Sequence, residues 1–328
     1  MVITKTPLRV SFFGGGTDYP AWVKEYGGAV LSTSIDKYSH LYVQRLLPFF
    51  SYKTKIVWSR IEEVGAINEI AHPSVRETLR FMNLDGGLAI TYNGDLPARS
   101  GVGSSSSFTV GFLHALYGLK KVTPDKKKLA EEAIHIEQNC IKENVGSQDQ
   151  IAAAFGGFNK IEFNKDGSFT VMPIQLSKER CENLQKHMML FFTGFSRNAS
   201  DVAHEQIKNI PNKIKELHAM HGMVDEAIGI LQRNGDWLGD FGRLLNKSWE
   251  LKRDLSAHIS NDAIDNLYKR AMDAGALGGK LLGAGGGGFF LVYARPEKQK
   301  KIRAALSELL YVPFAFENEG SKIIYQAH

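Results

Sequence analysis

The stretch Gly101-Val-Gly-Ser-Ser-Ser-Ser107 stands directly before a segment with a helical pattern. In that segment Phe108, Phe112, Ala115 and Leu119 are four, three and four residues apart, which is the spacing of one helical face. Glycine permits backbone conformations and close approaches that a side chain would block. A helix start offers unpaired N–H groups and a positive dipole end. The stretch therefore predicts a phosphate-binding loop, with a plain serine-capped loop as the alternative.

Two further glycine clusters flank predicted strands. Gly14-Gly15-Gly16 follows a strand expected over 2–13, and Gly283–Gly288 precedes a strand expected over 289–293. No Gly-Lys-Ser/Thr follows the serine-rich stretch, so it is not a Walker loop, and the first cluster lacks the Gly-x-Gly-x-x-Gly spacing of dinucleotide-binding folds. The third cluster is expected to line a cleft and support the phosphate loop, or else to form a tight turn.

The chain has 328 residues, more than one hydrophobic core usually holds, which suggests two domains. Strands and helices alternate in an α+β pattern, and we divide the chain into domains 1–180 and 181–328. Residues 177–186 are interpreted as a connector. In the first domain, Asp36-Lys37 separates strands expected over 29–35 and 39–46. In the second, long helices are expected over 199–209, 211–233, 237–256 and 260–274.

Composition excludes several classes of protein. Two cysteines exclude a disulfide scaffold and a cysteine-based zinc site. The net charge of +5 comes from 40 Lys+Arg against 35 Asp+Glu, and these residues are scattered, which favours a solvated surface over nucleic-acid binding. No apolar stretch reaches the length of about 20 residues that a membrane span needs. The first ten residues predict a strand without a signal-peptide core, so a cytoplasmic location is expected.

Three motifs, in this order, resemble those of the GHMP kinases, the family of galactokinase, homoserine kinase, mevalonate kinase and phosphomevalonate kinase. They are Pro7-Leu-Arg-Val-Ser-Phe-Phe-Gly-Gly-Gly-Thr-Asp-Tyr19, Gly101-Val-Gly-Ser-Ser-Ser-Ser107 and Lys280-Leu-Leu-Gly-Ala-Gly-Gly-Gly-Gly-Phe289. The resemblance implies a two-lobed fold, with an N-terminal lobe like domain 2 of ribosomal protein S5 and a ferredoxin-like C-terminal lobe. It also implies transfer of a phosphoryl group from ATP to an alcohol.

A closer likeness within the family is to its heptose 7-phosphate kinase branch. It is carried by residues 28–38, 103–111, 146–154 and 193–199. This likeness implies ATP and a heptose phosphate as the partners. The reaction would be phosphorylation of the anomeric hydroxyl, giving the 1,7-bisphosphate used to supply nucleotide-activated heptose for surface polysaccharide.

The resemblance also assigns binding residues. ATP would be bound by Gly101, Val102, Gly103, Ser104, Ser105, Ser106, Ser107, Gly285 and Gly286. The sugar would be bound by Gly15, Gly16, Thr17 and Asp18, with Arg197 as a candidate for the distal phosphate. Galactokinase has Glu-His where this chain has Gly15-Gly16, which leaves room for a larger sugar.

Asp149 is the candidate catalytic carboxylate. Ser147 and Gln150 have the spacing of a capping box, which would place Asp149 in the first turn of a helix ending at Gly156. The helix dipole there favours an ionised carboxylate, as proton acceptance from a hydroxyl requires. Spacing alone leaves open an Asp that only stabilises the helix start. The resemblance implies that Arg9 pairs with Asp149 and with the transferred phosphoryl group.

Glu137, on a helix expected over 127–140, and Ser105 would share Mg²⁺ by the same resemblance, since Mg²⁺ prefers oxygen ligands. Glu143 is interpreted as a solvated helix residue, and Lys280 as either phosphate-facing or exposed. Two other functions stay open: a kinase of another sugar, such as fucose, and a nucleotide-binding regulator without turnover. The presence of Asp149, Glu137, Arg9 and Ser105 together favours an enzyme.

Overall fold

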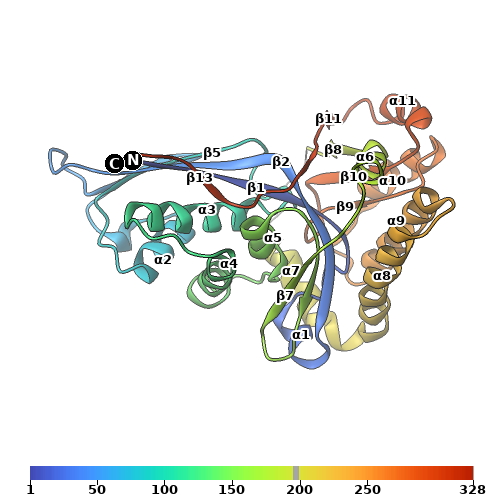
Figure 1. Cartoon of the computed structure of the whole chain (residues 1–328), viewed down its shortest axis with the longest axis horizontal. Coiled ribbons are helices and arrows are strands. Elements are labelled where there is room, and N and C mark those ends of the chain that lie inside the picture. Colours follow the sequence, from blue (N-terminus) through green and yellow to red (C-terminus); the bar gives the residue numbers. More distant parts are fainter. Residues whose placement is uncertain (195–198, 328) are drawn as a thin grey trace.

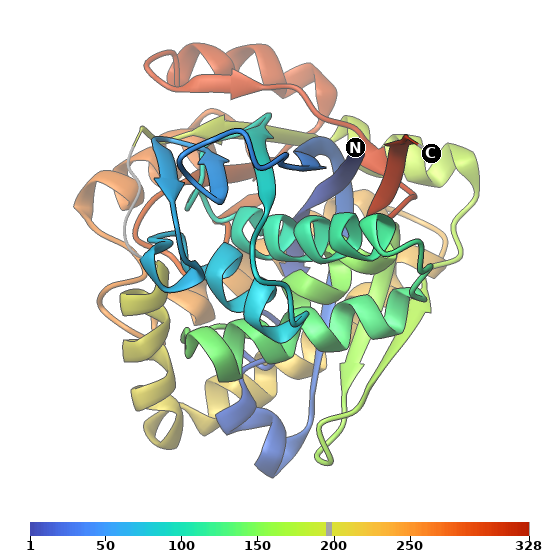
Figure 2. The same cartoon turned by 90° about the vertical axis from the view of Figure 1, so that its left-hand side faces the viewer.

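A computed structural model describes residues 1–194 and 199–327 of the chain (Figure 1). Two sheets, of nine and four strands, form the framework of this part. The larger sheet carries its helices on one face, and the smaller sheet lies at the other end of the molecule with a second group of helices (Figures 1 and 2). None of the described helices is both long and apolar enough to cross a membrane.

The N-terminal lobe alternates strands and helices up to residue 173. Its elements are β1 (Val2–Phe13), α1 (Pro20–Tyr26), β2 (Gly28–Arg45), β3 (Thr54–Val57), β4 (Ile61–Val64), α2 (Pro73–Phe81), β5 (Leu88–Gly94), α3 (Ser104–Leu119), α4 (Lys126–His135), α5 (Gln148–Phe155), β6 (Phe158–Phe163) and β7 (Phe169–Pro173). A 3-10 turn (Ile67–Glu69) precedes α2, and a π-helical segment (Ile136–Ile141) continues α4. The strand expected over 2–13 is confirmed.

One long strand, β2, replaces the two strands expected on either side of Asp36-Lys37. It pairs with β1 along its length, and the register shifts between Pro7 and Leu8, opposite this dipeptide. The shift accommodates the extra residues as an irregularity of the ladder rather than as a turn. Asp36 instead binds the C-terminal part of the chain, since its N–H donates to the carbonyl of Ala315 and its carboxylate accepts from the N–H of Ala315.

The C-terminal lobe contains the smaller sheet. Its elements are α6 (Lys178–Lys186), β8 (Met188–Phe192), α7 (Ala199–Asn209), a 3-10 turn (Ile210–Asn212), α8 (Ile214–Gln232), α9 (Trp237–Arg253), α10 (Asp262–Asp273), β9 (Gly278–Leu281), β10 (Phe289–Tyr293), α11 (Pro296–Ala305) and β11 (Leu310–Val312). The strand order β11-β8-β10-β9 is antiparallel throughout. In chain order this is 4-1-3-2, the arrangement of a ferredoxin-like lobe, as expected.

The sequence interpretation of residues 177–186 as a connector is wrong, because α6 occupies them. The Ser177 side chain caps this helix by accepting from the N–H of Arg180. Leu184 is the one buried residue of α6, so the segment lacks the apolar periodicity by which a helix is predicted.

The division at residue 180 also misses a return of the chain to the first lobe. β12 (Phe316–Glu317) pairs with β2, and β13 (Lys322–Gln326) pairs with the outer side of β1. The two chain ends therefore lie side by side (Figure 1). Residues 181–328 are not one contiguous structural unit, since the last strands complete the sheet of the N-terminal lobe.

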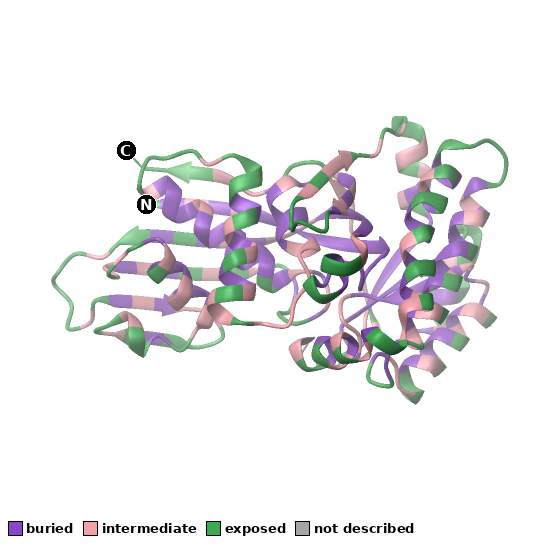
Figure 3. Ribbon diagram, turned by 90° about the horizontal axis from the view of Figure 1, so that it is seen from below, coloured by how far each residue is buried: buried purple, intermediate pink, exposed green. Residues whose placement is uncertain are grey.

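The long strands β1 and β2 belong to the cores of both lobes. Near its start, β1 contributes Val2 to the core between the larger sheet and its helices. Near its end, it contributes Phe12 to a second core with Phe241 and Leu291 of the C-terminal lobe, and the rings of Phe12 and Phe241 pack edge to face at 5.7 Å. Buried positions continue along these strands between the lobes (Figure 3). Shared strands thus fix the lobes around the space between them.

Two of the glycine clusters contact each other backbone to backbone. A Cβ on Gly101 would lie 2.4 Å from the carbonyl oxygen of Leu282, and one on Gly283 would lie 2.5 Å from the Cα of Gly101. The N–H of Phe289 donates to the carbonyl of Ser100 at 2.9 Å. The third cluster therefore supports the serine-rich loop from behind, and both glycines are needed for this close approach.

We predict that Gly101→Ala destabilises the protein more than Gly167→Ala. The two glycines have nearly the same φ, +84° and +86°, so each alanine should cost about 1–2 kcal/mol of backbone strain. Only at Gly101 does the new Cβ meet backbone, because nothing lies within 4 Å at Gly167. Overpacking should add about 1–3 kcal/mol. Equal free energies of urea unfolding for the two variants would contradict the contact.

Candidate active site

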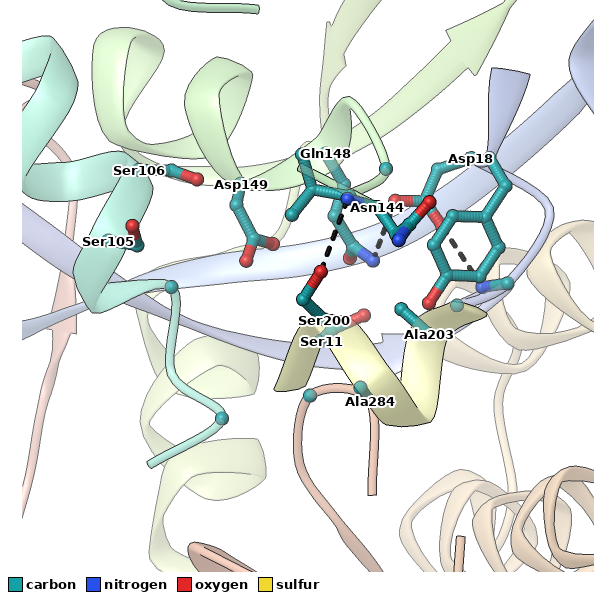
Figure 4. A pocket seen from close by; sticks show the side chains of 18 of the residues that line it. Ser11, Asp18, Ser105, Ser106, Asn144, Gln148, Asp149, Ser200, Ala203 and Ala284 are labelled. Carbon is teal, nitrogen blue, oxygen red and sulfur yellow. Dashed lines mark hydrogen bonds between the residues drawn. The ribbon is translucent and has the colours of Figure 1, made fainter. Parts of the chain in front are cut away.

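A cavity of about 180 Å³ lies between the lobes, where the three glycine clusters meet (Figure 4). We call it the central cavity. Its walls include Arg9 and Asp149, the start of α3, the loop before α5, the start of α7 and the third glycine cluster. Residues 9, 101, 149 and 283, far apart in the sequence, are thereby brought to one place. Such a concave site with convergent polar groups is where a ligand is expected.

Part of the serine-rich loop lines the central cavity. Gly101, Gly103, Ser104, Ser105 and Ser106 line it, and α3 begins after Gly103, whose φ is +76°. The start of this helix faces the cavity with N–H groups of the kind that can bind an anion.

Two residues of the loop do not reach the cavity. Val102 is fully buried, and Ser107 donates from Oγ to the carbonyl of Thr6 at 3.0 Å. They hold the loop against β1 instead of facing a ligand.

Arg9 and Asp149 form a bidentate ion pair. Arg9 Nε donates to Oδ1 of Asp149 at 2.8 Å, and a terminal guanidinium nitrogen donates to Oδ2 at 2.9 Å. The other terminal nitrogen donates to the carbonyl of Gly101 at 2.6 Å. Arg9 is 4% exposed and Asp149 is 25% exposed, so the guanidinium lies inside while the carboxylate still faces the cavity. The expected pairing is confirmed, and the fork of donors fixes the orientation of the carboxylate.

The predicted capping box before Asp149 is wrong. α5 begins after Ser147, and Asp149 lies in its first turn, but Ser147 makes no side-chain cap. The Oγ of Ser147 accepts from Nε2 of Gln138 at 3.1 Å, and Gln150 donates to Glu137. Both members of the box thus bind the π-helical segment Ile136–Ile141 instead, because that segment offers competing partners.

Glu137 is buried with one oxygen engaged and one free. Oε2 accepts from Oγ of Ser106 at 2.8 Å and from Nε2 of Gln150 at 2.5 Å. Oε1 is buried and has no hydrogen-bond partner among the described residues. Burial raises the pKa of Glu137 to about 7. The hydroxyl in contact with Glu137 is that of Ser106, whereas Ser105 lines the cavity with an exposed side chain.

This oxygen set fits a divalent cation. Mg²⁺ binds carboxylate and hydroxyl oxygens and keeps several waters and substrate phosphates as its other ligands. The unpartnered Oε1 of Glu137 is a buried acceptor that such an ion, or its water, would satisfy. Ser106 belongs in this set beside the predicted Ser105 and Glu137.

The first glycine cluster and Asp18 form the opposite wall. Gly15, Gly16 and Asp18 line the cavity, and Asp18 is 3% exposed. Its Oδ1 accepts from the N–H of Gly16 at 3.0 Å, and its Oδ2 accepts from Nε2 of Gln148 at 3.1 Å (Figure 4). Burial raises the pKa of Asp18.

Thr17 does not reach the cavity, contrary to its assignment to the sugar. It is fully buried, and its Oγ1 donates to the carbonyls of Gly14 and Ala29. The hydroxyl holds the turn after β1, which places Gly15 and Gly16 at the wall.

The third glycine cluster reaches the cavity through Gly283 and Ala284. Gly285 and Gly286, assigned above to ATP, are not among the lining residues. The N–H of Gly286 donates to the carbonyl of Ile259 at 2.9 Å, and a Cβ on Gly285 would clash with the same residue. These glycines let the loop pack on the segment after α9. Arg197 lies outside the described residues.

Sequence reasoning missed several groups in the cavity. Lys252 of α9 lines it and is buried. Lys280 of β9, interpreted above as either phosphate-facing or exposed, is also buried and lines the cavity. Glu143, interpreted as a solvated helix residue, lies in the loop before α5, lines the cavity, and has a pKa raised by burial. One signal was available for Lys252, because it continues the buried face formed by Leu245 and Trp249 at helical spacing.

Comparison with known proteins identifies the family. Residues 66–157 match the GHMP kinases N terminal domain, and residues 230–312 match the GHMP kinases C terminal domain. The chain is 31% identical to the D-glycero-alpha-D-manno-heptose 7-phosphate kinase of Campylobacter jejuni, over 97% of each chain. The chain belongs to the GHMP kinase family. This GHMP kinase is also 24% identical to the galactokinase of Pyrococcus furiosus, over 96% of this chain and 95% of the relative.

The fold of this GHMP kinase agrees with a solved structure over its whole length. The crystal structure of a D-glycero-D-manno-heptose 1-phosphate kinase from Bacteroides thetaiotaomicron superposes with a TM-score of 0.81 at 24% identity, covering 100% of both chains. Similarity to these relatives shows that the chain is a sugar kinase of the heptose kinase kind. It is therefore an ATP-using phosphotransferase with an alcohol acceptor. Transfer from ATP generally requires a divalent metal.

We predict that Glu137→Gln changes how stability depends on pH in metal-free buffer. A carboxyl whose pKa is raised on folding stabilises the fold below its unfolded pKa of about 4.5, and this contribution is lost as pH rises through about 7. Glutamine does not titrate. Wild type should therefore lose several degrees of melting temperature relative to the variant between pH 5 and pH 8, since one pKa unit corresponds to about 1.4 kcal/mol. If the melting temperatures of wild type and variant change with pH in parallel, the pKa of Glu137 is not raised by folding, and the prediction is wrong.

Proposed function

We propose that this GHMP kinase phosphorylates the anomeric C1 hydroxyl of D-glycero-D-manno-heptose 7-phosphate with Mg²⁺-ATP. The similarity to the Campylobacter jejuni kinase, which spans nearly the full length of both chains, supports the sugar. Gly15 and Gly16 in the wall of the cavity support an acceptor larger than a free hexose. A kinase of fucose or another sugar is the alternative that experiment must exclude.

The pair formed by Arg9 and Asp149 is the observation that carries the proposed chemistry. A phosphoryl transfer site needs positive donors near the transferred group and a carboxylate near the acceptor hydroxyl. Arg9 contacts the carbonyl of Gly101 in the phosphate loop and both oxygens of Asp149, so it connects these two requirements. The carboxylate of Asp149 is therefore held beside the place where the loop would bind the terminal phosphate.

Each residue then has a role in the proposed reaction. The N–H groups at the start of α3 bind the phosphates of ATP, and Ser104 and Ser105 add hydroxyl donors, since the hydroxyl of Ser106 donates to Glu137. Asp149 orients the anomeric hydroxyl and accepts its proton, while Arg9 stabilises negative charge on the transferred group. Asp18 has spare acceptor capacity for sugar hydroxyls, because each of its oxygens accepts one bond from the protein.

Mg²⁺ would be held by Glu137 with the hydroxyls of Ser105 and Ser106. When bound, it neutralises charge on the phosphates of ATP. The contribution of the protein is the buried Oε1 of Glu137 and the serine hydroxyls at the start of α3.

The acceptor is tested by comparing turnover of heptose 7-phosphate, unphosphorylated heptose, fucose and galactose at equal concentrations of ATP. We expect kcat/KM for heptose 7-phosphate to exceed that for each unphosphorylated sugar by at least about 100-fold, because a buried phosphate makes several charge-assisted bonds. Product analysis by phosphorus NMR should give an anomeric phosphate. Equal turnover of free sugars would remove the heptose 7-phosphate assignment.

The role of Asp149 is tested by Asp149→Asn. The amide keeps the size of the side chain but no longer accepts a proton, so turnover should fall by at least about 100-fold. Affinity for a non-hydrolysable ATP analogue, measured by calorimetry, should stay within a few-fold, because the phosphate loop is intact. Asp166→Asn, on the exposed turn between β6 and β7, is the matched control and should keep full turnover. Near-normal turnover of the Asp149 variant would assign proton acceptance to another group.

A further inference from the structure

Two lysines lie buried in the central cavity, and the proposed chemistry does not use them. Lys252 on α9 is 4% exposed, and Lys280 on β9 is 2% exposed. Lys252 Nζ donates to the carbonyl of Gly283, and Lys280 Nζ donates to the carbonyl of Phe12 at 2.9 Å. Both side chains line the cavity. We call these two ammonium groups, with the carbonyls that hold them, the lysine corner.

No carboxylate of the described residues contacts the two ammonium groups of the lysine corner. Each ammonium is left with N–H donors beyond its one backbone acceptor. Asp149 is paired with Arg9, whereas Asp18 accepts only from the uncharged donors of Gly16 and Gln148 and attracts both lysines without contacting them. A buried charge without a partner is costly.

Burial and the neighbouring cations lower the pKa of both lysines, that of Lys252 to about 8. Arg9 contributes to this effect at both positions. The same environment would favour any ligand that brings negative charge, since the anion would restore the ammonium forms and use their free donors.

One side of the lysine corner adjoins the phosphate loop, because Gly283 contacts Gly101, and its other side adjoins the first glycine cluster. Its two carbonyls belong to the end of β1 and to the third glycine cluster, close to the wall formed by Gly15 and Gly16. A Cβ on Gly16 would lie 3.8 Å from the side chain of Leu255, which follows Lys252 by three residues. The phosphates of ATP already have the start of α3. The corner therefore adjoins the acceptor side of Asp149.

We propose that Lys252 and Lys280 bind the phosphate that the acceptor sugar already carries. This rests on the proposed function, and it names the residues that would select a phosphorylated sugar over a free one. The phosphate would accept from both ammonium groups while the reacting hydroxyl faces Asp149. Specificity then comes from two buried ammonium groups whose unused N–H donors a phosphate satisfies, because a free sugar would leave them without an anion in contact.

The test is Lys252→Met, with Lys247→Met as control. Methionine keeps the length of the side chain without its charge, and Lys247 lies exposed on the same helix. We expect KM for heptose 7-phosphate to rise at least about tenfold in Lys252→Met, since bonds to charged groups are worth that much or more. KM for ATP, and kcat/KM for unphosphorylated heptose, should stay within about threefold. Lys247→Met should match wild type throughout.

Two further measurements distinguish binding from a structural role. Lys252→Met should melt no lower than wild type, because the variant removes a buried unpaired charge. The rise in melting temperature that heptose 7-phosphate induces without ATP should be reduced in Lys252→Met and in Lys280→Met. If either variant is destabilised yet keeps this ligand-induced rise, the lysine corner is structural and the proposal is overturned.

Other outcomes separate this inference from the proposed function. A raised KM for ATP, or an equal loss of kcat on phosphorylated and free acceptors, would place the lysines on the transferred phosphoryl group and overturn the inference. If wild type uses heptose 7-phosphate and Lys252→Met does so with unchanged KM, the inference fails alone. If wild type neither binds nor uses heptose 7-phosphate, the proposed function fails and the inference fails with it.

Discussion

The guanidinium of Arg9 is the interaction on which the rest of the site depends. It binds both carboxylate oxygens of Asp149 and the carbonyl of Gly101, and the backbone N–H of Arg9 donates to the carbonyl of Val102 at 3.0 Å. Strand β1, the serine-rich loop and helix α5 are thereby held in one arrangement. Because Arg9 is buried, these bonds are shielded from water and hold more strongly than they would at the surface.

The glycine clusters serve this arrangement by letting backbones approach one another. Gly101 and Gly283 are in direct contact, and Gly146 is needed because a Cβ there would lie 1.8 Å from Oδ2 of Asp18. The serine-rich loop is thus supported by the C-terminal lobe, while the loop before α5 packs against Asp18. The site lies between lobes that share strands β1 and β2, which explains how motifs at the two ends of the chain form one cavity.

The amino-acid sequence predicted the elements of the fold best where local signals decide the structure. Strand β1, the start of α3 and the glycine end of α5 follow from composition and spacing, and the pairing of Arg9 with Asp149 followed from family resemblance. Prediction failed where distant partners compete. Ser147 and Gln150 fit a capping box, yet Gln138 and Glu137 bind them instead. Lys252 was missed as a site residue, and the place of Lys280 stayed open, because burial of a lysine depends on the packing of two lobes, which spacing along the chain does not encode.

A crystal structure with a non-hydrolysable ATP analogue, Mg²⁺ and heptose 7-phosphate tests the central claim most directly. The account predicts the triphosphate on the main-chain N–H groups at the start of α3. It also predicts the anomeric oxygen within about 2.6–3.2 Å of the Asp149 carboxylate, the reach of a hydrogen bond that can transfer a proton. A triphosphate bound elsewhere, or an acceptor whose anomeric hydroxyl faces away from Asp149, would contradict it.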